Sequence, residues 1–260
     1  MTSDVSWTDS AATIAGVRLN YSRAGKGTPV VVLHHVIGTV DRLPFYDSLA
    51  GTNDTIVVNL PGFGKSERPE WMRHPRDIAA MVQWLLHDLN VRNAAVVGLG
   101  FGGWVAAEMA SQGPGDFSKL VLVGAMGINP PDGYIMDQAL VSYIDYARAG
   151  FHTDEGFKSV YGDVSIDQLE IFDICREMSF RIAWKPYMYS QTLPHLLGGI
   201  RASALVVVGE HDNIVPHSAA DVYVKSLRGA RKEVVAGSGH CVDMEKPAEL
   251  AGLVTKFINA

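Results

Sequence analysis

Short runs of apolar, mostly β-branched residues recur along the chain and are bounded by turn residues. The runs span residues 29–34, 55–60, 94–100, 119–125, 204–210 and 232–237. Within each run the apolar residues are continuous rather than alternating, which is typical of strands buried on both faces of a parallel sheet. Residues 12–23 alternate weakly around Gly16 and predict an N-terminal antiparallel hairpin.

Helical patterns separate these strands. Between two of them, apolar residues recur at helical spacing, namely Ile78, Met81, Val82, Leu85, Leu86 and Leu89. A helix between buried strands predicts a βαβ crossover, and the repeated alternation predicts one α/β domain over residues 1–260.

The strand rhythm stops between residues 130 and 200. Helical patterns at residues 136–150 and 165–180 are the clearest features of this segment, which also carries many aromatic residues. A block placed between successive strands of a sheet forms either a cap over the sheet or a local elaboration.

Composition and charge indicate which kinds of partner the chain can bind. The chain is 47% hydrophobic and 19% charged, with a net charge of −6 and no basic run. We expect no surface that binds nucleic acid or membrane, and we expect a small molecule as the partner.

No targeting segment or long apolar window is evident, so we expect a soluble, cytoplasmic protein. Cys175 and Cys241 lack zinc or disulfide spacing and are expected to be free thiols.

A glycine-rich turn follows the strand at residues 94–100. Gly98, Gly100 and Gly103 fit G-x-G-x-x-G, the pattern of a dinucleotide-binding turn. That interpretation is weak, because the next strand lacks the expected acidic residue and the turn comes third in the βαβ series.

The same turn fits G-x-S-x-G with glycine at its centre. Gly98 and Gly102 flank Gly100, as small residues flank the nucleophile in a sharp strand-to-helix elbow. Glycine adopts that strained backbone easily, so the elbow can persist without a nucleophile. The simpler alternative is a tight turn that serves only to pack helix on strand.

An acid and a histidine follow the elbow in chain order. Asp212 comes directly after the strand at 204–210, and His240 lies between the last strand and a C-terminal helical segment. The order elbow, acid, histidine is the one expected of an α/β-hydrolase triad.

With these residues the chain resembles the α/β-hydrolase superfamily over nearly its full length. "VVVLHHVIG" (30–38) is similar to the family's strand and oxyanion loop, and "NLPGFGKSERP" (59–69) resembles its Asp-x-Pro-Gly-x-Gly-x-Ser turn. Residues 183–212 also resemble the family. The resemblance implies a mostly parallel sheet flanked by helices, with a core at 1–129 and 201–260 and a helical cap at about 130–200.

The resemblance also implies roles for particular residues. Gly100, Asp212 and His240 would form the catalytic group, with His240 as general base held in one tautomer by Asp212. The backbone N–H groups of Val36 and Phe101 would form the oxyanion hole. Neighbouring residues are expected to take other roles: Asp243 as a helix-start residue, Cys241 with its thiol turned away from His240, and His211 and His217 as exposed side chains.

Further residues are candidates for contact with substrate. His34 and His35 occupy the positions where the family usually has His-Gly, and at least one of them could place an imidazole in the pocket; no complete metal-ligand set is visible. The aromatic residues of the cap segment either line the pocket or pack its core, and we single out Tyr143, Trp184 and Tyr187.

Three explanations compete for the glycine at position 100. A native serine has been removed, or the enzyme works without one through an activated water, or the chain is a silent binding protein derived from a hydrolase. We expect hydrolysis of a small apolar carbonyl compound, an ester or lactone before a C–C bond, with no cofactor. A homodimer is left open, and a dinucleotide-binding oxidoreductase is the remaining alternative.

Overall fold

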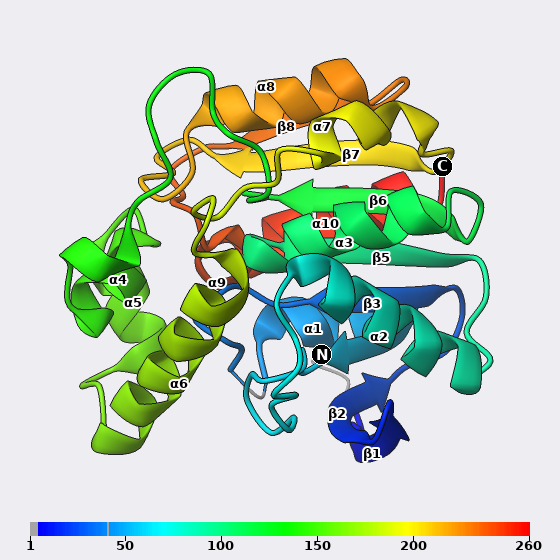
Figure 1. The fold of residues 1–260 in the computed structure, drawn as a ribbon, viewed down its shortest axis with the longest axis horizontal. Helices are drawn as coiled ribbons and strands as arrows, with labels where there is room; N and C mark the ends of the chain where they lie inside the picture. The colour runs from blue at the N-terminus through cyan, green and yellow to red at the C-terminus, as the bar shows by residue number, and fades with distance from the viewer. Residues whose placement is uncertain (1–4, 41) are drawn as a thin grey trace.

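The chain folds around one eight-stranded sheet, and the computed structural model describes residues 5–40 and 42–260. The strands are β1 (Thr8–Ile14), β2 (Val17–Ala24), β3 (Pro29–Leu33), β4 (Asp54–Val58), β5 (Ala94–Leu99), β6 (Phe117–Val123), β7 (Ser203–Gly209) and β8 (Arg231–Val235). Their order across the sheet is β1-β2-β4-β3-β5-β6-β7-β8 (Figure 1). β2 pairs antiparallel with both β1 and β4, and the other neighbouring strands pair in parallel. Residues 1–4 lie outside the described residues, so the expectation that the N-terminus carries no targeting segment falls partly outside them.

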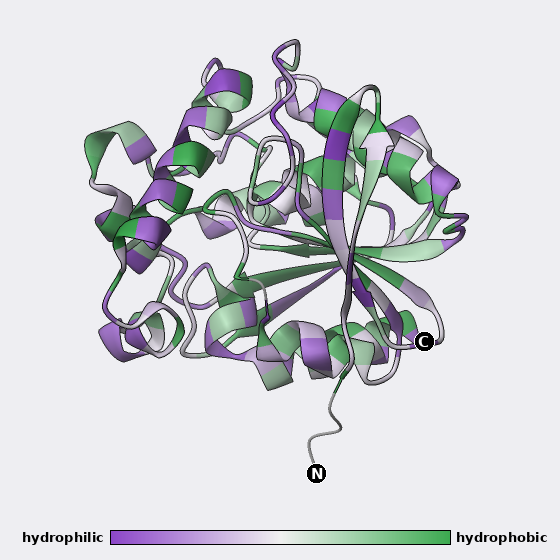
Figure 2. Ribbon diagram, turned by 90° about the horizontal axis from the view of Figure 1, so that it is seen from below, coloured by the Kyte–Doolittle hydropathy of each residue, from purple (hydrophilic) through white to green (hydrophobic). Residues whose placement is uncertain are grey.

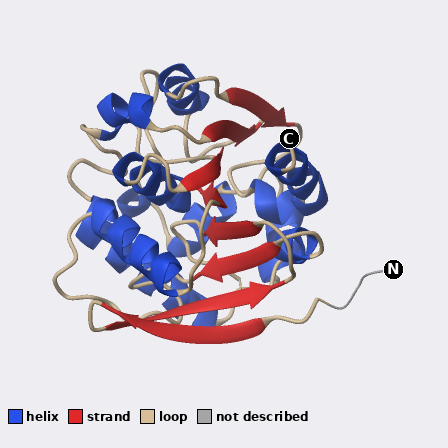
Figure 3. Cartoon of the chain, turned by 90° about the vertical axis from the view of Figure 1, so that its right-hand side faces the viewer, coloured by secondary structure: helices blue, strands red, loops and turns tan. Residues whose placement is uncertain are grey.

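Helices cover both faces of the sheet (Figure 3). They are α1 (Pro44–Ala50), α2 (Pro75–Asp88), α3 (Phe101–Gln112), α4 (Tyr143–Ala149), α5 (Asp154–Tyr161), α6 (Ile166–Ala183), α7 (Leu193–Leu196), α8 (His217–Ser226), α9 (Val242–Glu245) and α10 (Pro247–Ile258), with short 3-10 turns η1 (Gln138–Leu140) and η2 (Leu197–Gly199). α2, α3, α7 and α8 pack side by side on one face, and α1 packs with α10 on the other. This architecture confirms the predicted α/β-hydrolase fold.

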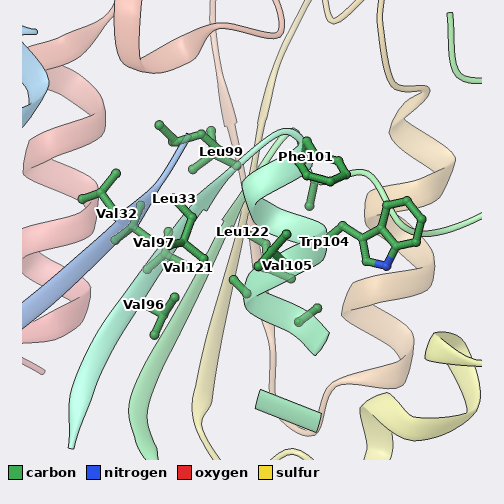
Figure 4. Packing of buried hydrophobic residues seen from close by; sticks show 14 of the residues in the cluster. Val32, Leu33, Val96, Val97, Leu99, Phe101, Trp104, Val105, Val121 and Leu122 are labelled. Carbon is green, nitrogen blue, oxygen red and sulfur yellow. The ribbon is translucent and has the colours of Figure 1, made fainter. Parts of the chain in front are cut away.

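The core lies between the central strands and these helices. Every residue of β5 is buried, and so is each residue of α3 from Phe101 to Ala110. Figure 4 shows Val105 of α3 beside the apolar side chains of β3, β5 and β6, while Phe101 and Trp104 extend from the other side of the helix. The strands form the apolar centre of the molecule in Figure 2. Burial of this much apolar surface fixes the carboxyl ends of the strands in space.

The predicted strands are all present, with their ends shifted by one or two residues; the hairpin is longer than predicted. The predicted helix at 136–150 is wrong in extent, because the chain forms η1, then an extended residue at Val141, and only then α4. The Ser142 side chain accepts a hydrogen bond from Asp145 N–H and so begins α4 at that point. The prediction at 165–180 corresponds to α6, which Ser165 caps, whereas α5 was not predicted.

The segment between β6 and β7 leaves the sheet at its carboxyl edge. There α4, α5 and α6 stand beside the strand ends, as Figure 1 shows at the left of the molecule. We call these three helices the cap. Two ion pairs join α6 to the loop before α2: Arg68 Nη1 to Glu177 Oε1 at 2.6 Å, and Arg181 Nη2 to Glu70 Oε2 at 2.7 Å.

Candidate active site

Gly100 forms a sharp turn between β5 and α3. Its backbone has φ +52° and ψ −110°, a conformation that side-chain-bearing residues rarely adopt. The Gly100 N–H donates to Val123 O (2.8 Å), and its carbonyl accepts from Met126 N–H (3.0 Å). The turn is therefore fixed against the segment that continues from β6.

The flanking glycines are required by close backbone approaches. A β-carbon on Gly98 would lie 2.4 Å from Gly102 O, and one on Gly102 would lie 2.2 Å from Leu33 O. Both contacts are with backbone atoms, so no side chain can be accommodated without moving β3 or α3. The glycine pattern thus reflects close packing of the elbow on the oxyanion loop.

His240 and Asp212 meet at this edge of the sheet. His240 Nδ1 lies 2.8 Å from Asp212 Oδ2, and both side chains are buried. Asp212 Oδ1 accepts hydrogen bonds from Ile214 N–H (2.9 Å) and Val215 N–H (2.8 Å). A carboxylate only accepts, so Nδ1 donates in this hydrogen bond and Nε2 is left to face the site.

A second histidine–carboxylate pair faces the first. His35 Nε2 lies 2.8 Å from Asp243 Oδ1, and the two side chains are 2% and 0% exposed. Asp243 lies in the short helix α9, as the sequence suggested, but its carboxylate points to His35. Sequence reasoning missed this pairing because the two residues are separated by 208 positions.

The two imidazoles converge on Gly100. An ideal β-carbon on Gly100 would lie 2.6 Å from His35 Nδ1 and 2.7 Å from His240 Nε2. The ring centroids are 5.0 Å apart, and neither nitrogen has a hydrogen-bond partner among residues 5–40 and 42–260. An oxygen atom beside Gly100 would therefore be within hydrogen-bonding reach of both rings.

A small cavity lies over this point. It has room for about one water molecule and is lined by His35, Val36, Ile37, Tyr146, Ala147, Gly150, Ile214, His240 and Cys241. Tyr146 comes from α4, and its buried hydroxyl has no hydrogen-bond partner among the described residues. Burial raises the pKa of Tyr146 well above its usual range, so the phenol remains a neutral hydrogen-bond donor. No pattern in the sequence distinguishes this buried tyrosine from Tyr143.

Val36 and Phe101 hold the positions that the family template assigns to oxyanion donors. Val36 lines the cavity, and Phe101 is the first residue of α3. Within the described chain, neither amide donates to a backbone carbonyl. The N–H groups of a first helical turn have no partner inside the helix, so Phe101 N–H is available to a ligand.

The expectation that His34 binds substrate does not fit the structure. Its Nδ1 lies 2.7 Å from His35 O, and its Nε2 accepts from Leu60 N–H at 3.1 Å. Burial lowers the pKa of His34 to about 4, so the ring is neutral and both its nitrogens are used by the backbone. His34 therefore positions the loop after β3. Of these two neighbouring histidines, His35 is the one that faces the site.

The cap aromatics singled out from the sequence do not line the cavity. Tyr143 hydrogen-bonds Asp173 and lies under the Arg176 guanidinium on the outer side of the cap. Trp184 is 49% exposed and packs against Tyr187. The Tyr187 hydroxyl accepts from Gln138 N–H and donates to Met136 O, and these contacts stabilise the start of the cap segment.

The remaining candidates have other surroundings. Cys241 Sγ lies beside Gly150, and burial raises the pKa of this thiol well above its usual range, which makes it a poor nucleophile. His211 is exposed and stacks on His152, whereas His217 is half-buried and bonds Gly209 O. In the described part of the chain no group of three His, Cys, Asp or Glu side chains is arranged to hold a metal.

Comparison with known proteins decides the family. The model of the alpha/beta hydrolase family matches residues 30–253. The chain belongs to the α/β-hydrolase family. A 2-hydroxymuconate semialdehyde hydrolase of Pseudomonas sp. (strain CF600) is 25% identical, with 94% of this chain and 91% of that protein covered. Esterase YbfF of Escherichia coli (strain K12) is 22% identical over 89% of this chain and 93% of its own.

Solved structures of other proteins share the fold of this chain at low sequence identity. A serine hydrolase involved in carbazole degradation superposes with a TM-score of 0.78 at 18% identity, covering 98% of this chain and 99% of the other. An esterase from Exiguobacterium antarcticum gives 0.77 at 19% identity, covering 97% and 100%. The named relatives are hydrolases of carboxylic esters and C–C bonds, so this chain is a hydrolase of the family. In the described residues no helix is both long and apolar enough to cross a membrane.

Proposed function

We propose that this α/β-hydrolase cleaves a small, mostly apolar ester or lactone with water as the direct nucleophile. One observation carries the proposal: the nitrogens of two buried imidazoles lie 2.6 and 2.7 Å from the β-carbon position of Gly100. A family serine would occupy that position, and here a water oxygen can take its place.

His240 is the general base in this proposal. Its Nε2 accepts a proton from the water as the oxygen attacks the carbonyl carbon, and Asp212 stabilises the imidazolium that forms. The N–H groups of Val36 and Phe101 receive the developing oxyanion, and each such donor in a dry site contributes about 3–4 kcal/mol. The Tyr146 hydroxyl lines the cavity, has no hydrogen-bond partner in the described chain, and binds a substrate oxygen.

The close approaches to Gly100 support glycine as the residue this site requires. Any side chain there would contact both imidazole nitrogens at less than 3 Å. His35 cannot yield easily, because its other nitrogen is held by Asp243. These contacts favour an enzyme that works without a serine over a serine enzyme that has lost its nucleophile.

A hydrolase of C–C bonds is the second candidate. The relatives named 2-hydroxymuconate semialdehyde hydrolase are 25% and 24% identical to this chain, and each covers 94% of it. Water activated beside Gly100 could add to the carbonyl next to such a bond in the same way. A catalytically silent binding protein is disfavoured, because the chain retains two complete histidine–carboxylate pairs at one cavity.

Hydrolysis of p-nitrophenyl acetate by the wild type and the His240→Gln variant tests the proposal. We expect turnover by the wild type and a loss of about 10²–10⁴-fold in His240→Gln, the usual contribution of a general base. His195→Gln is the matched control, because His195 is exposed on α7, and it should keep full activity.

Two results would overturn the proposal. One is an unchanged rate in His240→Gln. The other is a wild type that hydrolyses no member of a panel of acetate esters, γ-lactones and 2-hydroxymuconate semialdehyde while still binding one of them, which is the behaviour of the binding-protein alternative.

A further inference from the structure

In a mechanism with a single base, the His35–Asp243 pair transfers no proton. Its imidazole faces the same point as His240, but it comes from the loop after β3 and is supported by a different carboxylate. Two ring nitrogens that point at one another across a cavity are compatible when one carries a proton and the other does not, because a donor then faces an acceptor.

The surroundings of the two carboxylates are unequal. Asp212 accepts two backbone N–H bonds besides the one from His240. Asp243 Oδ2 has no partner in the described chain, and the side chain is 0% exposed. A buried carboxylate with so few donors needs a positive charge beside it. His35 is the ring that can supply this charge.

The other titratable groups around this pair supply no positive charge. Burial lowers the pKa of His34 and raises the pKa of the tyrosines and the thiol that face the pair, so these groups are neutral: His34, Tyr46, Tyr146, Tyr161 and Cys241. The compensating proton therefore belongs on the imidazole pair, on the ring next to Asp243.

Resting on the proposed function, we infer that His35 is the general acid of the reaction and His240 its general base. Water forms a bond from its oxygen to the carbonyl carbon while one of its protons passes to His240 Nε2. The bond from that carbon to the leaving oxygen then breaks, and the proton on His35 Nδ1 passes to the leaving oxygen. The products are a carboxylic acid and an alcohol.

The site is restored by one proton transfer. After the reaction His240 carries the extra proton and His35 lacks it, and the two nitrogens face each other across the cavity. Passage of the proton from His240 Nε2 to His35 Nδ1, directly or through the next water, returns the starting state.

This division of roles identifies the class of substrate. A nitrophenolate leaves without a proton, whereas an alkoxide leaves slowly unless an acid protonates it. A general acid beside the base therefore speeds the hydrolysis of alkyl esters and lactones, but it adds little to the hydrolysis of activated aryl esters. We assign alkyl esters and lactones as the substrate class.

A series of acetate esters with different leaving groups tests the inference. The wild type, His35→Gln and His240→Gln are compared on p-nitrophenyl, phenyl, trifluoroethyl and ethyl acetate. Glutamine at position 35 keeps an N–H group for Asp243 but cannot transfer a proton. We expect kcat/KM of His35→Gln to fall less than about tenfold on p-nitrophenyl acetate and about 10²–10⁴-fold on ethyl acetate.

The other variants make the result specific. His240→Gln should lose activity on all four esters, since the base is needed whatever the leaving group. Asp243→Asn, which removes the carboxylate that favours protonated His35, should repeat the leaving-group dependence of His35→Gln. Thermal unfolding of each variant confirms that it is folded.

The outcomes separate this inference from the proposed function. An equal loss in His35→Gln on all four esters, or a leaving-group dependence in His240→Gln instead, overturns the assignment of the acid while ester hydrolysis stands. Absence of wild-type turnover on all four esters and on γ-lactones, or full activity of His240→Gln, overturns the proposed function itself.

Discussion

Gly100 and His35 depend on each other at the residue scale. From its resemblance to the family, the sequence is expected to have a glycine where His35 stands and a serine where Gly100 stands. Here the imidazole of His35 lies 2.6 Å from the position that a β-carbon at Gly100 would take. The His35 imidazole is thus compatible with glycine at position 100 and crowds any residue with a side chain there.

This dependence predicts the behaviour of serine variants. Gly100→Ser alone should not react with a fluorophosphonate probe, because the serine β-carbon would be crowded by both imidazoles. The double variant His35→Gly with Gly100→Ser recreates the usual pair and should be labelled in a manner that depends on His240. Intact-protein mass measures the adduct. Labelling of the single variant at the rate of the double variant would show that His35 does not block the position.

Tyr146→Phe tests the free hydroxyl in the cavity. An unpartnered buried hydroxyl costs roughly 1–3 kcal/mol, so its removal should leave thermal stability unchanged or higher. The kcat/KM for ethyl acetate should fall about tenfold, because one hydrogen bond to substrate is lost. Tyr143→Phe, on the outer side of the cap, is the control. Equal activity of wild type and Tyr146→Phe would remove this residue from the site.

At the scale of elements, the central strands could be predicted because burial on both faces leaves an apolar run that few other structures require. The cap helices were harder. The break at Val141 depends on the Ser142 cap, and only the folded chain shows that Tyr146 faces the cavity while Tyr143 faces outward. Similarly, the sequence placed His34 and His35 together, but one backbone partner of His34, the N–H of Leu60, lies 26 residues away.

The cavity has room for about one water molecule, and Tyr146 and Ala147 of α4 line it. We predict that substrate enters when the cap moves, and that the ion pairs of α6 with Arg68 and Glu70 hold the cap in its closed position. Replacing Glu70 and Glu177 together with glutamine should raise kcat/KM for a bulky butyrate ester by roughly twofold to fivefold, the size expected for exposed ion pairs. The kcat/KM of the wild type for the same ester should also rise with ionic strength, because salt screens the two ion pairs. Asp221→Asn on α8 breaks a remote ion pair and should change nothing; a similar gain there would exclude this role for the cap contacts.

At the scale of the whole molecule, stability should depend on pH through His34. The pKa of His34 is about 4 in the folded chain and about 6.5 when unfolded, so the unfolded state binds more protons between these values. The free energy of unfolding therefore falls as pH drops from about 6.5 to about 4, by on the order of 3 kcal/mol from this residue. Urea denaturation of wild type and His34→Gln across this range measures the difference, and identical pH dependence in the two would contradict it.

The whole fold is what assembles the site. His35, Gly100 and Asp212 follow three different strands, and His240 and Asp243 come from the last loop and helix before the C-terminal helix. The order elbow, acid, histidine was readable in sequence because the family fixes it. The pairing of His35 with Asp243 was not, since no local pattern links residues that meet only at the sheet edge. A homodimer and a cytoplasmic location stay predictions.

We propose that water, held by two imidazoles beside Gly100, attacks the substrate without a covalent intermediate. Rapid-quench intact-protein mass spectrometry during turnover of p-nitrophenyl acetate distinguishes this route from an acyl-enzyme. We expect no pre-steady-state burst of nitrophenolate and no acetylated protein at any time. An acetyl adduct that forms and decays at the rate of turnover would show a covalent intermediate and rule out direct attack by water.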